Sequence, residues 1–438
     1  MSIRASKLLD WSAKIFAVVV FFLATNGLVR LLQYPSGTVE AVDHAGDPVT
    51  QVMWLGFYGA TFLLILVHWD RFVNVALSDP LLLLLVGIVV ASVLWSAAPT
   101  VTLREDVAFV GTTMIGAYLA ARHGPGELLR LLAWALGIGA LLSLVFGLAL
   151  PSYGLDPADL DGAWQGIYSG GKNELGRNMA LSSMVFLLLA LGARRYRWVA
   201  WLGFGLSVGL LLLSDSVTSL VTFLIVLVLL TAGMALRWPY TLAVPGFVLL
   251  LAGSTLATMW FAGNMESVFG AFGRDSTLTG RTLLWPAIVE MIWQRPWLGY
   301  GYGAFWLGWE GESSQVWHWT FGIEPVHAHN GFLDLCLHVG LLGVSIFALG
   351  FLAGFRRAVS WARATTTWEG LWPLAFLSFI LVYNVAESSL LANNSILWLL
   401  YVVTVVSTVV RPSEAAMAER TAPKDRSLMV SQGGGSGS

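Results

Sequence analysis

The chain has 438 residues, of which 57% are hydrophobic and only 11% carry a charge. Soluble domains contain about 25% charged residues, and a soluble protein of this length could not bury so much apolar surface. The composition excludes a secreted or cytosolic enzyme and predicts an all-α, polytopic membrane protein. The formal net charge of -2 argues against nucleic acid as a partner. The single cysteine, Cys336, excludes an intramolecular disulfide and a cysteine zinc cluster.

A membrane helix needs about 20 mostly apolar residues, and twelve runs approach this length. They cover residues 15–32, 51–68, 81–95, 107–121, 129–150, 175–191, 198–213, 217–236, 240–261, 330–352, 371–386 and 395–410. We expect about 12 transmembrane helices: nine within residues 1–261 and three within 329–411, separated by a long loop at 262–328. Residues 412–438 are expected to be a cytoplasmic tail that ends in a glycine–serine linker. The first run lacks a small-residue cleavage site, so no signal peptide is expected.

The basic residues predict how the chain is oriented, because cytoplasmic loops are enriched in Lys and Arg. With a cytoplasmic N-terminus and twelve spans, 17 of the 24 Lys and Arg residues face the cytoplasm and 7 face outward. This bias favours an N-in, C-in topology. The seven outward cations are Arg30, Arg104, Lys172, Arg177, Arg274, Arg281 and Arg295.

Two long polar segments, 151–174 and 262–328, then fall on the extracytoplasmic side. The second is much longer than an ordinary connection, and its aromatic and helical patterns argue against disorder. Within 279–294, Thr279 is a candidate N-cap. We expect a short interfacial helix there, lying flat on the membrane, with one face formed by Leu284, Ile288, Met291 and Ile292.

Several outward cations lie beside glycine-rich turns. Lys172 and Arg177 belong to SGGKNELGRN, and Arg274 and Arg281 frame RDSTLTGR. One interpretation is snorkelling to the interface or contact with lipid phosphates. The other is a site for an extracytoplasmic pyrophosphate, such as that of a lipid-linked sugar, because guanidinium groups bind phosphate bidentately and glycines expose backbone N–H groups.

The segment PVHAHNGFLDLCLHVGLLG carries four ionisable side chains where the long loop enters a membrane helix. His327 and His329 precede the helix, whereas Asp334 and His338 are spaced to pair on one of its faces. Ionisable groups within a span are candidate functional sites, and a neutral histidine can act as a general base near pH 7. Alternatively, the histidines only cap the helix. A metal site of His327, His329 and Asp334 is a third interpretation, with weak support from the H-x-H spacing.

Two further features leave alternatives open. Asn384 and Glu387 lie at the external end of the eleventh run, where the carboxylate could orient an arginine or a sugar hydroxyl, or belong to a solvated helix end. Eight of the 21 tryptophans fall between residues 260 and 319. They could form the aromatic belt of a membrane protein or platforms on which sugar rings stack.

Six segments occur in an order that resembles the O-antigen ligase and Wzy-type polysaccharide polymerase superfamily. They are LWSAAPTVTLRE (94–105), GIYSGGKNELGRN (166–178), SDSVTSL (214–220), TGRTLLWPAIVEMIWQRPWLGYGYGAF (279–305), HAHNGFLDLCLHVGLLG (327–343) and AESSLL (386–391). The H-x-H-N and K-N-x-L-G forms look closest to exopolysaccharide polymerases.

The resemblance implies a GT-C-like membrane fold and a metal-independent, inverting glycosyltransferase without a cofactor. Its donor would be an undecaprenyl-diphosphate-linked saccharide, and its acceptor a saccharide. The enzyme would lie in the bacterial inner membrane among membrane lipids, with its active site facing the periplasm. Other glycan export proteins are further candidate partners.

In this interpretation His329 is the catalytic base that takes the acceptor proton. Its positioning is assigned to His327 and Asn330, and Glu387 would orient part of the site. The residues expected to bind the pyrophosphate, in order of preference, are Arg281, Lys172, Arg177 and Arg274.

Three other functions are compatible with the sequence. The first is O-antigen ligation, the same reaction with lipid A-core as the acceptor. The second is a transporter of lipid-linked saccharide. Many transporters contain inverted repeats and matched pairs of broken helices, and the sequence shows neither. The third is a non-catalytic scaffold, which would not need cations and histidines gathered on one side of the membrane.

Overall fold

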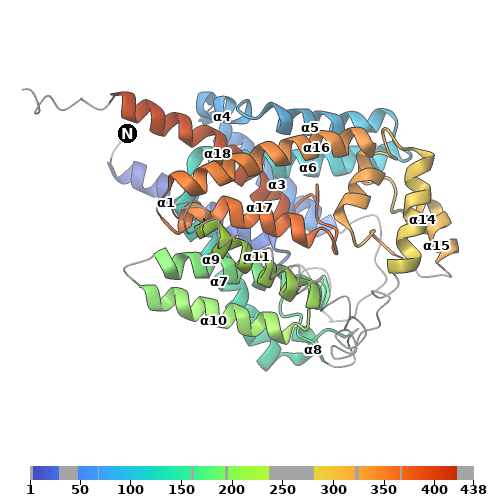
Figure 1. The fold of residues 1–438 in the computed structure, drawn as a ribbon, viewed down its shortest axis with the longest axis horizontal. Coiled ribbons are helices and arrows are strands. Elements are labelled where there is room, and N and C mark those ends of the chain that lie inside the picture. Colours follow the sequence, from blue (N-terminus) through green and yellow to red (C-terminus); the bar gives the residue numbers. More distant parts are fainter. Residues whose placement is uncertain are drawn as a thin grey trace, which may run out of the picture.

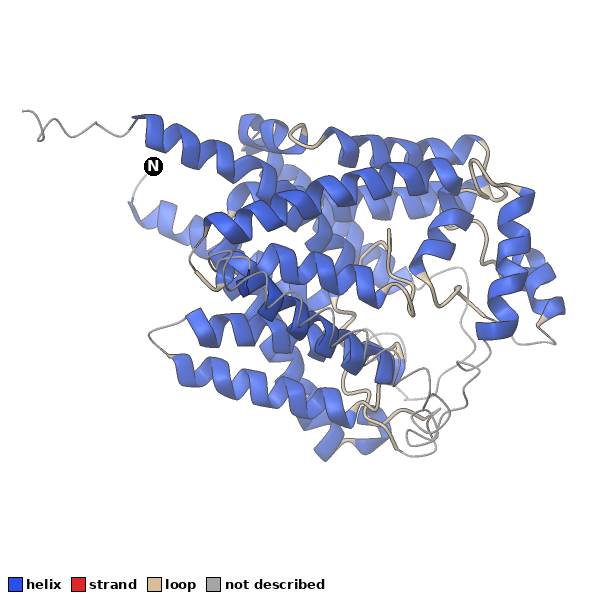
Figure 2. Ribbon diagram, viewed as in Figure 1, coloured by secondary structure: helices blue, strands red, loops and turns tan. Residues whose placement is uncertain are grey.

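The computed structural model describes residues 3–28, 48–67, 69–157, 159, 162–192, 196–235, 281–320, 325–365 and 367–421. These residues are mainly helical, and Figure 2 shows no strand among them. Four of the described helices are long and apolar enough to cross a membrane: Pro48–Val67, Pro125–Ala149, Gly171–Gly192 and Gly331–Ala364. Shorter apolar helices cover Pro80–Leu94, Arg197–Leu213, Val217–Thr231, Glu369–Tyr383 and Ile396–Val409.

The helices follow the expected order along the chain. The first part contains α1 (Ile3–Ala24), α3 (Pro48–Val67), α4 (Trp69–Ala76), α5 (Pro80–Ala91), η1 (Ser92–Leu94), α6 (Pro99–Arg122), α7 (Pro125–Ala149), α8 (Pro151–Gly154), α9 (Gly171–Gly192), α10 (Arg197–Leu213) and α11 (Val217–Ala235). The second contains α14 (Arg281–Gln294), η2 (Gly308–Glu310), α15 (Ser313–Trp319), α16 (Gly331–Ala364), η3 (Glu369–Leu371), α17 (Trp372–Tyr383) and α18 (Ile396–Thr421).

Eleven of the twelve predicted apolar runs overlap one of these helices, and the run at 240–261 lies outside the described residues. Helix α18 continues to Thr421, into the segment predicted to be a tail. The number of helices that cross the membrane stays a prediction, because the shorter apolar helices fall below the length of a full span.

Figure 1 shows most helices running roughly along the longest axis of the molecule, with α14 and α15 at the end opposite the N-terminus. Helix α9 packs on α10 and α11, α6 packs on α18, and α16 packs on α5. The turns that precede α9 and α16 lie towards the end that carries α14 and α15 (Figure 1). This end of the bundle therefore gathers the segments that carry most of the polar motifs.

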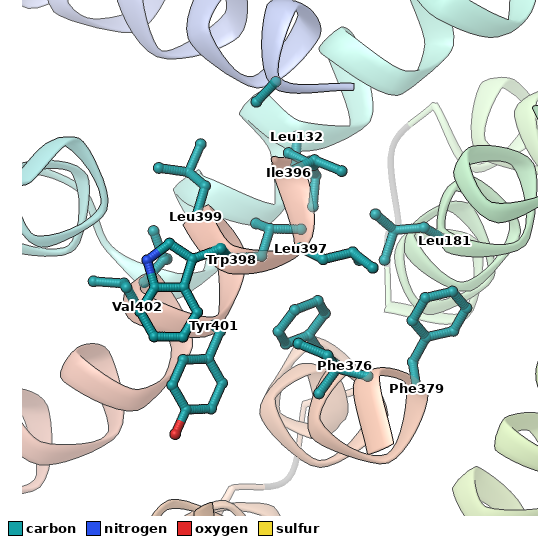
Figure 3. Packing of buried hydrophobic residues seen from close by; sticks show 14 of the residues in the cluster. Leu132, Leu181, Phe376, Phe379, Ile396, Leu397, Trp398, Leu399, Tyr401 and Val402 are labelled. Carbon is teal, nitrogen blue, oxygen red and sulfur yellow. The ribbon is translucent and has the colours of Figure 1, made fainter. Parts of the chain in front are cut away.

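The hydrophobic core is centred on α17 and α18 (Figure 3). Trp398 is fully buried and stacks on Phe109 at 4.9 Å and on Tyr401 at 5.1 Å between ring centroids. Its indole N–H donates to the Thr113 hydroxyl at 2.9 Å, so the one polar atom of the side chain is satisfied. Because these contacts link α18 to α6, the core holds together helices that are distant in the sequence.

A smaller hydrophobic cluster supports α14. Its members include Leu284, Ile288, Met291 and Ile292, which confirms that these four residues share a buried face. The cluster joins α14 to α15 and to the first part of α16 through Val316 and Leu337. The predicted N-cap, Thr279, lies outside the described residues.

Helix α16 is interrupted at Gly340, which the predicted continuous span at 330–352 missed. Gly340 has φ 62° and ψ -172°, a backbone conformation available essentially to glycine alone. The segment 296–301 docks into the interruption. The Leu337 and His338 carbonyls accept from the Tyr300 and Gly301 amides, at 2.7 and 3.1 Å.

On the other side of the interruption, the Leu341 and Leu342 amides donate to the Pro296 and Trp297 carbonyls, at 2.8 and 3.2 Å. The docked segment therefore satisfies backbone groups that the interruption would otherwise leave unpaired. As a result, the short first part of α16 can take its own direction.

We predict that Gly340→Ala destabilises the protein. Alanine is strained at this φ and ψ, and a Cβ there would lie 2.3 Å from the Trp297 carbonyl carbon. We expect a loss of at least about 1–3 kcal/mol in unfolding free energy, measured by thermal melting in detergent. The matched control is Gly87→Ala in α5, where a Cβ meets nothing within 4 Å and where alanine should be neutral or stabilising. Equal melting temperatures for the two variants would contradict this account.

Candidate functional site

The first turn of α9 is fastened by carboxylates. The Lys172 amide donates to Asp156 at 2.9 Å, and the Gly170 amide donates to Glu174 at 2.7 Å. Gly171 has φ +71° and approaches the Asp156 side chain closely, so glycine is required there. In the pyrophosphate interpretation the glycines of this motif expose backbone N–H groups, but the Gly170 and Lys172 amides are bonded within the protein.

The two cations of this motif are also paired. The Lys172 ammonium forms an ion pair with Asp159 and another with Asp215 at 3.5 Å. The Arg177 guanidinium donates to Glu174 at 2.8 Å. Its Nε is buried and has no hydrogen-bond partner among the described residues. The predicted phosphate-binding cations therefore lie in a mixed-charge cluster.

Asn330 begins α16. Its side-chain oxygen accepts from the Phe332 and Leu333 amides, as an N-cap does, and its side-chain nitrogen donates to the Val385 carbonyl at 3.1 Å. The Asn330 amide in turn donates to the Ser388 hydroxyl at 3.1 Å. This residue therefore links the start of α16 to the 384–391 segment, and its role in positioning the base stays a prediction.

His329 lies directly before this cap and has φ +49°, in the left-handed region that is uncommon for residues other than glycine. Its backbone amide donates to His327 Nδ1 at 3.2 Å, and the two imidazole rings lie 4.1 Å apart. His327 therefore contacts His329 directly, and its positioning role stays a prediction.

Glu387 faces His329. Its Oε2 lies 3.8 Å from His329 Nδ1, and its Oε1 accepts from the Asn173 side chain at 3.3 Å. The Glu387 side chain is 10% exposed and the His329 side chain 37%. The burial of Glu387 argues against a solvated helix end. The carboxylate links α9 to the start of α16, and Arg177 lies within its electrostatic reach.

The predicted pairing of Asp334 with His338 is not observed as a hydrogen bond. Asp334 accepts from the Trp306 indole N–H at 2.8 Å and from the Ala328 amide at 3.1 Å. Both Asp334 and His338 nevertheless line one cavity, so they do share a face. Among the described residues, no group of three or more His, Cys, Asp and Glu side chains is arranged to hold a metal ion.

Each cation that is predicted to face outward and whose side chain is described has a carboxylate partner. Besides Lys172 and Arg177, Arg104 pairs with Glu105 at 3.1 Å and Arg295 with Glu312 at 3.2 Å. Arg30, Arg274 and the side chain of Arg281 lie outside the described residues; Arg281 itself begins α14. The pyrophosphate-binding roles of Arg274 and Arg281 stay predictions.

Several tryptophans have a structural role besides the two considered from the sequence. The indole N–H groups of Trp285 and Trp317 donate to the Ala328 and Pro325 carbonyls, each at 3.0 Å. Together with the bond from Trp306 to Asp334, they fasten the 281–320 segment to the chain that leads into α16. These three residues position the site through hydrogen bonds.

Sequence reasoning missed the carboxylates that pair with the start of α9 and its cations. It weighed Lys172 and Arg177 as free cations, although Glu174 precedes Arg177 by three residues, a helical spacing at which opposite charges pair. Asp156, Asp159 and Asp215 lie in turns, and nothing in the local pattern placed them beside the start of α9.

Comparison with known proteins supports the resemblance found in the sequence. The O-antigen ligase family matches residues 202–348, which include most of α10, all of α11, α14 and α15, and the interrupted start of α16. The exopolysaccharide production protein ExoQ of Rhizobium meliloti (strain 1021) is 28% identical over 320 residues, or 70% of this chain and 71% of that protein. These matches confirm the resemblance to the O-antigen ligase and polysaccharide polymerase superfamily. Together with the apolar helices, they support a multi-pass membrane protein.

We predict that Glu174→Ala destabilises the protein by about 3–5 kcal/mol, because it leaves the charge of Arg177 without its partner in a buried position. The side chains of this pair are only 13% and 8% exposed. Glu312→Ala is the matched control, since its pair with Arg295 is 43% and 28% exposed and should contribute only about 0–1 kcal/mol. Thermal melting in detergent compares them, and similar shifts for both variants would refute the importance of the buried pair.

Proposed function

We propose that this chain is an inverting glycosyltransferase of the bacterial inner membrane that polymerises undecaprenyl-diphosphate-linked repeat units on the periplasmic side. The coarser assignment, a polysaccharide polymerase or ligase, follows from the family match and from the similarity to ExoQ. The observation that carries the finer proposal is the proximity of His329 to Glu387, beside the cations of α9.

In the proposed mechanism, Glu387 accepts a hydrogen bond from His329 Nδ1–H, which leaves Nε2 as the proton acceptor. The separation of 3.8 Å is longer than a hydrogen bond, and catalytic bonds of this kind often tighten only when substrate binds. The larger exposure of His329 suits a base that meets a substrate hydroxyl, and the shielding of Glu387 suits a group that orients this base.

The reaction is a single displacement. The acceptor hydroxyl oxygen forms a bond to the anomeric carbon of the donor, and its proton passes to His329. The bond between the anomeric carbon and the diphosphate breaks, and its electron pair leaves with undecaprenyl diphosphate. Negative charge grows on the leaving diphosphate, so cations nearby lower the barrier. Arg281 is the first candidate for this role, followed by Lys172, Arg177 and Arg274.

The carboxylate partners of the α9 cations bear on how a diphosphate would bind. Lys172 retains ammonium donor capacity beyond its two ion pairs, and the Arg177 Nε–H is unsatisfied among the described residues. We propose that both cations keep their carboxylates and contact the diphosphate through the remaining donors. The mechanism assigns no step to a metal ion, so activity should survive treatment with EDTA.

Ligation to lipid A-core is the second candidate, because the matching family is described as O-antigen ligase. Reconstitution of the purified protein in liposomes with lipid-linked repeat units distinguishes the two. A ladder of longer lipid-linked products supports the polymerase. Transfer only to added lipid A-core would establish the ligase, and the absence of any glycosyl transfer would refute both.

We predict that His329→Ala lowers the rate of polymerisation by about 10²–10⁴, the usual contribution of a general base. Glu387→Gln should lower the rate less, because the amide can still contact the imidazole but lacks the charge. The control is His318→Ala, an exposed histidine on α15. Rates are measured in liposomes with equal amounts of folded protein. Wild-type activity of His329→Ala would exclude a base at this position.

The proposed orientation places α15 in the periplasm and the end of α16 in the cytoplasm. Single cysteines at Gln315 and Ala364, two exposed positions, test this in a Cys336→Ala background. In intact cells, a membrane-impermeant maleimide should label Gln315→Cys, and should label Ala364→Cys only after the membrane is permeabilised. The reverse pattern would invert the topology and remove the proposed periplasmic site.

A further inference from the structure

A second polar site adjoins the proposed base. A cavity of about 310 Å³ lies between α6, the loop that follows α14, the first part of α16 and the 388–393 segment. Its volume is at the lower end of the range for small-molecule pockets, sufficient for a small part of a larger ligand. None of the mechanistic steps above uses this cavity.

One cation and two carboxylates line the cavity. Arg104 pairs with Glu105 at 3.1 Å, and Asn393 donates to the other Glu105 oxygen at 2.5 Å. The carboxylate of Asp334 is held by the Trp306 indole and the Ala328 amide. Two carboxylates and one guanidinium leave the lining without excess positive charge, so it suits a neutral ligand better than a diphosphate.

His338 lines the cavity with a partly exposed side chain. His338 Nδ1 is buried and has no hydrogen-bond partner among the described residues. The His338 ring is held edge-on against Tyr302, at 5.3 Å between centroids. The other ring nitrogen, Nε2, is not covered in this way, and a ligand hydroxyl could donate to it or accept from it. Trp306 also lines the cavity and is partly exposed, so the lining offers both hydroxyl partners and an apolar surface, as a sugar ring requires.

The position of the cavity connects it to catalysis. His327 lines the cavity, and its ring lies 4.1 Å from that of His329. A saccharide chain could therefore occupy the cavity with one ring while a neighbouring ring presents its hydroxyl to His329.

We infer that this cavity is a subsite for the acceptor saccharide, which holds a neutral sugar ring next to the ring that reacts. The inference rests on the proposed glycosyl transfer. It assigns His338, Trp306 and Glu105 to the binding of the acceptor and leaves the diphosphate to the cations of α9 and α14.

The test is a binding measurement without turnover, by calorimetry on the full chain in detergent. The probe is a mixture of short neutral oligosaccharides, released by partial acid hydrolysis from the polysaccharide that the host cells secrete. His338→Ala should weaken binding about threefold to tenfold, the usual effect of one lost hydrogen bond. His318→Ala is the matched control and should bind like the wild type. Val101→Phe narrows the cavity without removing a polar group and should also weaken binding. This variant tests the cavity independently if His338→Ala does not fold.

Inorganic pyrophosphate is the second probe, and its binding should be unchanged by either cavity variant. Unchanged affinity for the oligosaccharides in both variants would overturn the inference, as would a selective loss of pyrophosphate binding. During turnover, His338→Ala should raise KM for the acceptor and leave kcat within about twofold. A protein that binds the oligosaccharides at this cavity but transfers no sugar would refute the proposed function and leave the subsite standing.

Discussion

The interruption of α16 at Gly340 is the constraint on which the candidate site depends. In a membrane protein, backbone N–H and C=O groups need partners from the protein itself, and a broken helix exposes several of them. The 296–301 segment supplies these partners with four backbone hydrogen bonds. Because these backbone groups are paired, the chain can break here. The short stretch that carries Asp334 and His338 is therefore positioned by the 296–301 segment and not only by the long helix that follows.

Electrostatic compensation is the second organising feature. Lys172, Arg177 and Arg104 each have a carboxylate partner. An isolated charge in a poorly solvated site is expensive, and ion pairing lets the protein keep cations where a diphosphate is expected to bind. Such cations are fixed before the substrate arrives, which is the condition for stabilising charge in a transition state without reorganisation. The carboxylates nevertheless neutralise part of the positive charge of the α9 cations. A diphosphate bound there would therefore need further positive charge from outside the α9 cluster.

The apolar pattern predicted most helices because membrane helices are long and uniformly hydrophobic. The same uniformity concealed the break in α16: Val339, Leu341 and Leu342 continue the apolar run across Gly340, and a glycine within such a run is common. The break depends on the docking of a segment that precedes it by about 40 residues, which local periodicity does not report. The buried face of α14 was predictable, since residues spaced by three and four lie together on any helix.

The sequence predicted several of the residues that form the candidate site. It did not predict most of their hydrogen-bond and ion-pair partners. His329, His327, Asn330 and Glu387 do come together, because their motifs lie at the ends of helices that meet at one end of the bundle. Glu105 and Asn393 were missed, since they are separated by 288 positions in the sequence and only the packing of α6 on α18 joins them.

The two halves of the site come from different groups of helices, and this division suits an inverting displacement. The cations near Glu387, Lys172 and Arg177, belong to α9, in the lower part of Figure 1, whereas the cavity at His338 is built with α6, in the upper part. In a single displacement the nucleophile and the leaving group lie on opposite sides of the anomeric carbon. His327 and His329 stand between the two groups of residues. A donor held at α9 and an acceptor held at α6 would therefore meet at His329 from different directions.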